Sequence, residues 1–223
     1  MQQHSRGKAG PCQVPIGPGV MVEGLLTVPE QAHAIVLFVH GSGSSRYSPR
    51  NQFVARTLQE AGLATLLIDL LTPMEEEQDR LTAHLRFNID LLKGRVVGAT
   101  HWLTRLPETA ALSIGYFGAS TGAAAALVAA GALPHLVGAL VSRGGRPDLA
   151  GEALSHVQAP TLLLVGARDT PVIEPNRQAY SLLKGEKRLE LIAGATHLFE
   201  EPGTLEQVAQ RAQQWFVCYL RAK

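Results

Sequence analysis

Residues 118–122 read Gly-Ala-Ser-Thr-Gly, the G-x-S-x-G pattern that presents a nucleophilic serine. The motif follows an apolar run that ends at Phe117 and precedes an alanine-rich stretch, so we expect a sharp turn from a strand into a helix. Such a turn lifts a serine hydroxyl above the edge of a sheet, and the helix start offers backbone N–H groups to an oxyanion. The alternative is a turn that only caps the helix. We interpret Ser120 as the candidate nucleophile.

A serine hydroxyl is a weak nucleophile until a positioned base accepts its proton, so a histidine and an orienting carboxylate are expected downstream. Asp169 follows the apolar run 161–165, and His197 follows the run 188–192. Because serine, acid and histidine occur in this order in hydrolases that use the motif, we predict that Asp169 orients His197. His197 would then accept the proton of Ser120.

Each of these positions also has a simpler interpretation. Asp169 precedes a Thr-Pro pair, a setting that suits a turn or a helix cap, and His197 also fits a surface loop. Asp148 is the rival acid, although its Arg-Pro-Asp context favours a helix N-cap. Glu200 and Glu201 are expected to be solvated.

A glycine-rich loop is the expected source of a further oxyanion donor. Residues 40–45 read His-Gly-Ser-Gly-Ser-Ser after the apolar run 34–39, and small residues let backbone N–H groups approach a substrate oxygen. We expect the amides of Ser42 and Thr121 to form the oxyanion hole, with Gly43 as a substrate contact and a close alternative to Ser42. Glycine-rich loops also bind phosphates, but this one lacks the Lys-Ser/Thr ending of a P-loop.

Four arginines border the same region. Arg46 and Arg50 flank a predicted helix start, where the helix dipole disfavours cations, and Arg143 and Arg146 follow a later apolar run. One hypothesis is that they bind a carboxylate-bearing or phosphorylated substrate, with Arg143 as the candidate contact. The favoured interpretation is internal ion pairing with the glutamates of residues 75–77.

The elements that must position these groups alternate between short apolar runs and longer stretches of helical periodicity, which is typical of an α/β fold with a parallel sheet. Ligands bind at the carboxyl ends of strands in such sheets, where the candidate residues fall. The expected strands are 24–28, 34–39, 64–68, 113–117, 137–141, 161–165 and 188–192. The expected helices are 48–61, 79–106 (as two helices or one broken near Gly94), 121–130, 149–157, 175–183 and 204–220.

The composition is that of a soluble globular protein, with 46% apolar and 17% charged residues in 223. We expect a loose N-terminal arm at residues 1–19 and a single domain at 20–223. A net charge of +1 with scattered basic residues indicates a small-molecule substrate rather than nucleic acid or a membrane. Cys12 and Cys218 suggest neither a disulfide framework nor a zinc site, and no segment resembles a signal peptide or membrane span, so a cytoplasmic location fits best.

Four loops together resemble the dienelactone hydrolase-like branch of the α/β-hydrolases, over roughly residues 22–220. They are residues 40–44, 118–122, 166–169 and 194–197. The resemblance implies an eight-stranded, mostly parallel sheet with helices on both faces and a Ser-Asp-His triad at the three positions named above. Dienelactone hydrolase proper uses cysteine, so Ser120 points instead to carboxylester cleavage, with lactones or thioesters also possible and no metal or organic cofactor required. Similar domains are attached to phosphoribosyltransferases, so the resemblance leaves open a partner enzyme that the sequence does not name.

About twenty residues separate Val141 from Thr161, too few for the large helical lid of some lipases. An open site and activity on short-chain esters are therefore expected. A peptidase or a thioesterase is an alternative, because the same triad serves any acyl group. An alternative of a different class is a hydrolase-fold protein that binds a ligand without cleaving it, which would be expected to lack one triad residue.

Overall fold

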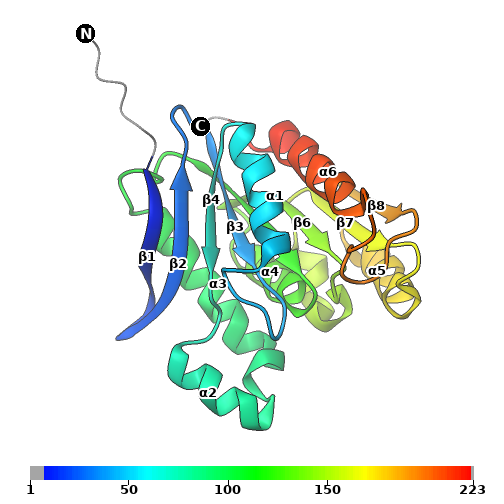
Figure 1. Ribbon diagram of the computed structural model, residues 1–223, viewed down its shortest axis with the longest axis horizontal. Coiled ribbons are helices and arrows are strands. Elements are labelled where there is room, and N and C mark those ends of the chain that lie inside the picture. The colour runs from blue at the N-terminus through cyan, green and yellow to red at the C-terminus, as the bar shows by residue number, and fades with distance from the viewer. Residues whose placement is uncertain (1–7, 222–223) are drawn as a thin grey trace.

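One eight-stranded sheet with helices on both faces forms the core of the computed structural model, which describes residues 8–221 (Figure 1). The strands are β1 (Lys8–Gly17), β2 (Val20–Val28), β3 (Ala34–Val39), β4 (Leu63–Ile68), β5 (Ser113–Ala119), β6 (Val137–Arg143), β7 (Thr161–Gly166) and β8 (Lys187–Ile192). The α-helices are α1 (Pro49–Glu60), α2 (Pro73–Thr82), α3 (Ile89–Leu103), α4 (Thr121–Ala132), α5 (Thr170–Leu182) and α6 (Thr204–Tyr219), with 3-10 helices η1 (Leu85–Phe87) and η2 (Pro147–His156). Within residues 8–221, every helix is too short or too polar to cross a membrane.

The strand order is β1-β2-β4-β3-β5-β6-β7-β8, in which β2 runs antiparallel to both of its neighbours. The pairs from β4 through β8 are all parallel. The expected α/β-hydrolase fold with a mostly parallel sheet is therefore confirmed. Because the parallel strands end at the same edge, the loops that follow β3, β5, β6, β7 and β8 are brought together there.

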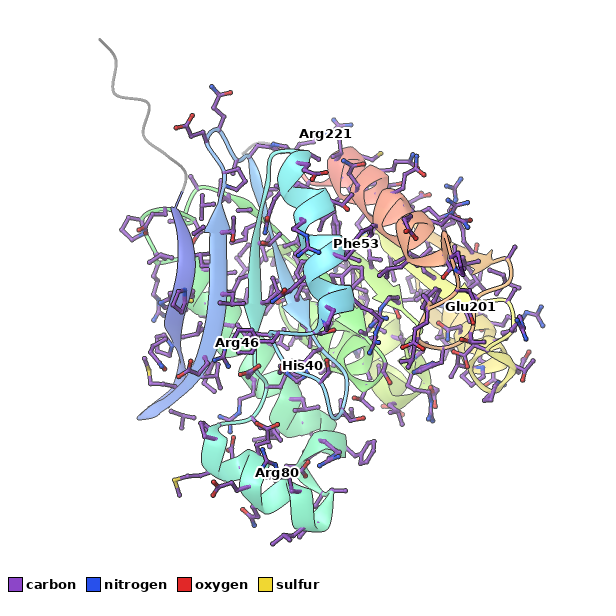
Figure 2. All side chains as sticks on the ribbon, viewed as in Figure 1. His40, Arg46, Phe53, Arg80, Glu201 and Arg221 are labelled. Atoms are coloured by element: carbon purple, nitrogen blue, oxygen red, sulfur yellow. The ribbon has the colours of Figure 1, made fainter. Side chains whose placement is uncertain are left out.

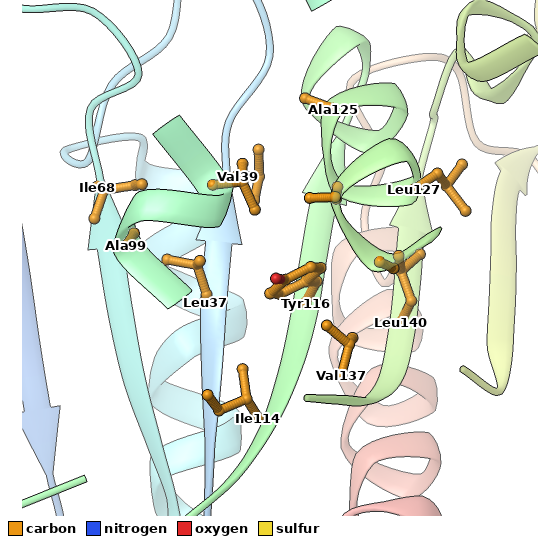
Figure 3. Packing of buried hydrophobic residues seen from close by; sticks show 14 of the residues in the cluster. Leu37, Val39, Ile68, Ala99, Ile114, Tyr116, Ala125, Leu127, Val137 and Leu140 are labelled. Atoms are coloured by element: carbon orange, nitrogen blue, oxygen red, sulfur yellow. The ribbon is translucent and has the colours of Figure 1, made fainter. Parts of the chain in front are cut away.

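Strand β3 illustrates why the central runs are apolar throughout. Ile35, Leu37 and Val39 belong to the cluster beneath α3, α4, η2 and α5, part of which Figure 3 shows. The alternate residues of β3 pack into a second cluster beneath α1 and α6. Successive side chains of a strand point to opposite faces, so a strand covered on both sides has no solvent-facing position for a polar residue.

The expected N-terminal arm is wrong for residues 8–17, which form the edge strand β1 paired along the length of β2. Its glycines and prolines favoured a loop, but prolines are tolerated on an edge strand because one side of it needs no ladder hydrogen bonds. The side chains of Val14 and Ile16 are buried, which anchors β1 to the core. The rest of the expected arm, residues 1–7, lies outside the described residues.

The stretch 79–106 was expected to form one broken helix or two helices, and its boundaries differ. A helix begins earlier, at α2, where Thr72 and Glu75 form a capping box. A 3-10 turn, η1, then separates α2 from α3, and α3 continues through Gly94 without a break. The break between the two helices therefore follows Thr82, where Ala83 adopts a left-handed conformation, and does not fall at Gly94.

Two other helices differ in detail from the expectation. The helix expected at 175–183 begins at Thr170 and contains Pro175 in its second turn, where the missing N–H removes a single helix bond. The helix expected at 149–157 is the 3-10 helix η2, interrupted at Gly151, where φ is +52°. Helix η2 occupies ten of the 17 residues that connect β6 to β7.

Candidate active site

Ser120 lies in the sharp turn from β5 into α4, with φ +49° and ψ −125°. A non-glycine residue at such a positive φ is strained by about 1–3 kcal/mol, and strain of this kind is concentrated at functional sites. The turn needs its two glycines. A Cβ at Gly118 would lie 2.5 Å from the Cα of Ala123, and a Cβ at Gly122 would lie 2.2 Å from the carbonyl oxygen of His40.

The loop between β6 and η2 holds the peptide groups of this turn on both sides. Ser120 donates its N–H to the carbonyl of Arg143 at 3.3 Å, and the N–H of Arg146 donates to the carbonyl of Ser120 at 3.1 Å. The fully buried Asn176 of α5 in turn donates to the carbonyl of Gly145 at 3.0 Å. The strained turn is thus fixed by hydrogen bonds from two other elements. Sequence reasoning gave no role to Asn176, because a helical asparagine carries no local signal for a distant carbonyl.

His197 and Asp169 are joined by a hydrogen bond of 2.6 Å between Nδ1 of the imidazole and Oδ2 of the carboxylate. A carboxylate accepts, so Nδ1 carries the hydrogen and Nε2 is left as the basic nitrogen. Asp169 is buried at the start of α5, yet its side chain does not cap that helix. The simpler interpretation of Asp169 as a helix cap therefore has no support in its hydrogen bonds.

His197 also lies close to the serine turn. A Cβ at Gly144 would be 3.6 Å from Cε1 of His197, and Gly144 directly follows Arg143, whose carbonyl accepts from the Ser120 N–H. Among the described residues no hydrogen bond of 3.5 Å or less joins Ser120 Oγ to His197; contacts of this kind often tighten only when substrate binds. The structure brings the predicted serine, histidine and aspartate to one edge of the sheet.

The rival acid Asp148 is engaged elsewhere. Its carboxylate accepts from Nε and Nη2 of Arg146 at 2.9 and 2.7 Å, a bidentate pair within the same loop. Asp148 lies at the start of η2, as the sequence predicted, but its side chain forms no capping hydrogen bond. Of the two candidate acids, only Asp169 forms a hydrogen bond with His197.

The expectation that Glu201 is simply solvated is wrong. Its carboxylate accepts from the backbone N–H of Thr196 at 3.1 Å and from the Thr196 hydroxyl at 2.7 Å. These hydrogen bonds from Thr196 hold the pKa of Glu201 below its ordinary value. Glu201 therefore fixes the residue immediately before His197. Its partner lies five positions away in an irregular loop, and no standard motif in the sequence marks such a bond.

The loop after β3 lies directly against the nucleophile turn. A Cβ at Gly41 would be 2.8 Å from the Cβ of Ser120, so only glycine allows this approach. The N–H of Ser44 donates to the carbonyl of Gly41 at 3.3 Å, and Gly43 has φ +70°, which is the geometry of a type II turn. Gly43 lies at the tip of this turn with no atom within 4 Å of a Cβ placed on it.

The two expected oxyanion donors are neighbours, but in an unexpected arrangement. The N–H of Ser42 donates to the hydroxyl of Thr121 at 3.0 Å, so this amide already has an acceptor. Thr121 is the first residue of α4, and backbone N–H groups of a first helical turn have no partner within the helix. Ser42 and Thr121 are therefore in contact beside Ser120, and the Thr121 hydroxyl is the present acceptor of the Ser42 N–H.

His40, to which the sequence assigned no role of its own, orients this loop. It is buried, with Nδ1 2.8 Å from the carbonyl of Gly41, and its Nε2 accepts from the N–H of Leu70 at 3.2 Å. Because Nε2 accepts, Nδ1 is the donor, and burial lowers the pKa of His40, which favours this neutral form. The carbonyl of Gly41 and the N–H of Ser42 share one peptide unit, so His40 sets the direction of the Ser42 amide.

A small cavity of about 40 Å³ opens beside the same loop, room for only a few waters. It is lined by loop residues from His40 to Ser45, by residues 69–71 after β4, and by side chains from α2 and η1. Figure 2 shows His40 and Arg46 at this end of the sheet, which faces α2. The cavity adjoins the expected oxyanion donor Ser42 and its neighbour Gly43 rather than Thr121 or Ser120.

The expected ion pairs between the arginines and residues 75–77 are not the ones that form. Glu75 instead pairs with Arg95 of α3. The partners of three of the four arginines are Asp69 and Glu23 for Arg46, Glu200 for Arg50, and Asp148 for Arg146. The acidic partners of Arg46 and Arg50 are at least 23 residues away in the sequence, so charge spacing did not reveal them. Arg143 has no carboxylate partner among residues 8–221.

Residues 22–219 match the family model described as the dienelactone hydrolase family. The chain belongs to the dienelactone hydrolase family. A crystal structure of dienelactone hydrolase from Anabaena variabilis is 59% identical, covers 97% of this chain and 100% of that chain, and has a TM-score of 0.95. The resemblance that the loops carry is thereby confirmed.

Two further proteins are similar to this chain, one in its fold and the other in its sequence. Est1E from Butyrivibrio proteoclasticus is 16% identical, covers 93% of this chain and 98% of its own, and has a TM-score of 0.78, which shows a shared fold. A Mycobacterium tuberculosis protein named "Putative phosphoribosyl transferase" is 58% identical over 208 residues, 93% of this chain and 46% of that protein. The chain thus spans about half the length of the curated relatives it matches.

Proposed function

We propose that this family member is a serine hydrolase that cleaves carboxylic esters through Ser120, His197 and Asp169. The observation that carries the proposal is the 2.6 Å hydrogen bond between His197 and Asp169 beside the strained Ser120 turn. A buried carboxylate that holds Nδ1–H leaves Nε2 as a base, and a base next to a serine hydroxyl is the arrangement needed for acyl transfer.

In the first step of the proposed reaction, Ser120 Oγ forms a bond to the ester carbonyl carbon while His197 Nε2 takes the hydroxyl proton. Asp169 stabilises the resulting imidazolium. The tetrahedral intermediate then collapses, the bond to the alcohol oxygen breaks, and His197 returns the proton to the leaving alcohol. In the second step water attacks the acyl-enzyme with His197 as base, and the acid is released from Ser120.

The oxyanion is proposed to lie at the N-terminus of α4, where it accepts from the amides of Thr121 and Ser42. The Ser42 N–H donates to the Thr121 hydroxyl at 3.0 Å, so the oxyanion would replace that hydroxyl as acceptor. A charged oxygen is a stronger acceptor than a neutral hydroxyl, which favours the exchange as charge develops. Donors held in place in this manner typically contribute a factor of about 10² to 10³ to kcat. Gly43, at the tip of the loop, is proposed as a substrate contact.

The substrates are proposed to be short-chain esters. The connection from β6 to β7 contains the short helix η2 and two short loops, which leaves no segment there for a large lid. We expect kcat/KM for p-nitrophenyl butyrate to exceed that for p-nitrophenyl palmitate, since a long chain would lie unburied in water and gain little binding energy. Initial rates below the micelle-forming concentration of the palmitate ester measure this ratio. A preference for palmitate would contradict the proposed class of substrate.

The nucleophile itself is tested by labelling with a fluorophosphonate probe followed by peptide mass spectrometry. We expect a covalent adduct on Ser120, and we expect His197→Ala to slow its formation, because no base then accepts the hydroxyl proton. A chain that takes no adduct yet binds small esters would instead be a ligand-binding member of the fold. Faster turnover of thioesters or peptide amides than of oxygen esters would move the assignment to a thioesterase or peptidase.

A link to phosphoribosyltransferases and a cytoplasmic location stay predictions. The first is supported by the name of the longer Mycobacterium tuberculosis relatives, of which this chain matches about half. A partner with that activity would supply or consume small phosphorylated metabolites, so the proposal is that the hydrolase acts in the same part of metabolism.

A further inference from the structure

Strand β8 is the last strand of the sheet formed by residues 8–221, at the opposite side from β1 (Figure 1). The edge strand β1 contains Pro11 and Pro15, which have no N–H to offer to an added strand. Strand β8 reads Lys-Arg-Leu-Glu-Leu-Ile and contains neither proline nor glycine. A lysine often protects an edge, but the ammonium group of Lys187 is turned back to the carbonyl of Leu183 at 2.7 Å. The outer edge of β8 is therefore open to pairing.

The backbone of β8 presents the N–H and C=O groups of alternate residues to this open edge. The carbonyls of Glu186 and Ile192 accept hydrogen bonds of 2.9 Å from β7 and from the residue that follows it. Because successive residues of a strand direct these groups to opposite sides, the even-numbered residues of β8 face β7. The residues whose N–H and C=O groups face outward are Lys187, Leu189 and Leu191.

A second copy of the chain fits this edge in an antiparallel register that is symmetric about Leu189. In that register Leu189 lies opposite Leu189 of the second copy, and Lys187 lies opposite Leu191. All of these are hydrogen-bonded pairs, in which the two facing residues exchange both N–H···O bonds. Registers centred on Arg188 or on Glu190 align fewer of the outward-facing residues. They also place two like charges directly opposite each other, which is destabilising.

The charges of β8 match in the same register. Arg188 lies opposite Glu190 of the second copy, and the two-fold axis repeats this pair on its other side. These are non-hydrogen-bonded pairs, in which facing side chains approach more closely. The Arg188 side chain is 66% exposed, and a groove of about 270 Å³ between β8 and α6 is lined by both Arg188 and Glu190. Arg211 of α6 also pairs with Glu190, which holds the carboxylate beside this groove.

We propose that the outer edge of β8 is an interface with a second copy of this chain, paired antiparallel across a two-fold axis at Leu189. The eight-stranded sheet then continues into the sheet of the second copy. Such a contact requires a patch that is complementary to itself, and the basic and acidic residues on either side of Leu189 provide one. The two β8 strands run in opposite directions, so the two Ser120 turns lie at opposite ends of the joined sheets.

The first test is the mass in solution, measured by sedimentation velocity over a series of protein concentrations. We expect the wild-type protein to have twice the mass of the chain. Arg188→Glu and Glu190→Lys each place two pairs of like charges across the interface, so each should weaken the dimer about tenfold to a hundredfold. Lys93→Glu, a charge reversal on α3, is the control and should leave the dimer unchanged. A wild-type chain that is monomeric at every concentration overturns the proposal.

A mixture of the two charge variants tests the register. In a mixed dimer the new glutamate of one chain faces the new lysine of the other, and the native Glu190 faces the native Arg188. All facing charges are again opposite, so the equimolar mixture should recover the dimer that neither variant forms alone. The melting curve of each variant shows that it is folded. Folded variants that do not recover the dimer when mixed, or that are fully dimeric alone, overturn the proposal.

Leu191→Pro tests the backbone pairing separately from the charges. It removes an N–H that faces outward, so the ladder with β7 is kept, as is usual for a proline on an edge strand. Leu191→Ala is the matched control, because it loses the same side chain, which is 43% exposed, but keeps the N–H. We expect a monomer for the proline variant and a dimer for the alanine variant, with hydrogen exchange at the Leu189 and Leu191 amides slowed only in the dimer. A dimeric Leu191→Pro with fast exchange at Leu189 overturns the proposal, whether or not the charge variants fold.

Discussion

Replacing Ser120 by alanine is expected to lower kcat for p-nitrophenyl butyrate by about 10⁶-fold, the loss found when a triad nucleophile is removed. No bond to the acyl carbon can form, so only the oxyanion donors and substrate binding remain to accelerate attack by water. The substitution should leave the fold intact. Alanine carries the same backbone strain at φ +49°, and the Ser120 side chain does not cap α4.

The measurement is initial-rate hydrolysis with the melting temperature of each variant recorded beside it. Ser181→Ala is the matched control, because its hydroxyl bonds only to the carbonyl of Gln178 on the exposed side of α5. Its kcat should equal that of the wild-type chain. If Ser120→Ala retained more than about one per cent of the wild-type kcat, a different nucleophile would be at work, since the contribution of a triad serine is far larger.

Replacing Asp169 by asparagine is expected to lower kcat by about 10⁴-fold with little change in structure. An asparagine amide that faces Nδ1 with its N–H₂ group stabilises the wrong tautomer, in which Nε2 carries the hydrogen and no longer accepts the Ser120 proton. Asp169 is buried and 2.6 Å from His197, so no other acid among the described residues holds this imidazole.

Asp148→Asn decides between the two candidate acids. Asp148 is bonded to Arg146 in its own loop, so we expect kcat to change by less than tenfold when its charge is removed, with a modest loss of thermal stability. The melting temperature of each variant is recorded beside its rate, so that a loss of folded protein is separated from a loss of kcat. A large loss in the Asp148 variant with an active Asp169 variant would exchange their roles.

The sequence predicted the parts of this site that rest on local chain geometry. Ser120 and Asp169 follow buried apolar strands and His197 follows the partly exposed edge strand β8, and parallel strands in one sheet end at one edge. Those two facts together place the three side chains near one another. The same local signals found the start of α1 at its serine cap.

The edge strand β1 shows where local reasoning failed. Its glycines and prolines have the composition of a loop, and its burial depends on an approach that no window of sequence displays. Gly98 of α3 allows this approach, because a Cβ there would lie 2.3 Å from the carbonyl oxygen of Ile16. Pairing with β2 and packing against α3 are both tertiary events, and they override the weak preferences of single residues.

The side-chain partners were also decided by the tertiary structure. Glu201 bonds to Thr196 where solvent was expected, the Ser42 amide donates to Thr121, and Glu75 pairs with Arg95. Hydrogen bonds and ion pairs depend on distance and direction in space to within a fraction of an ångström. Residue spacing along the chain does not specify such distances once the loops have folded.

By itself, then, the sequence determined the α/β fold, the family and the three residues proposed to act in the reaction. Apolar runs and the motifs at strand ends are local properties of the sequence, so they are recognised without knowledge of the tertiary contacts. Only the tertiary structure decided that β1 joins the sheet, which acid bonds to His197, and that Arg143 is left buried without a carboxylate. These outcomes depend on which elements pack together, because burial and pairing exist only after distant parts of the chain have met.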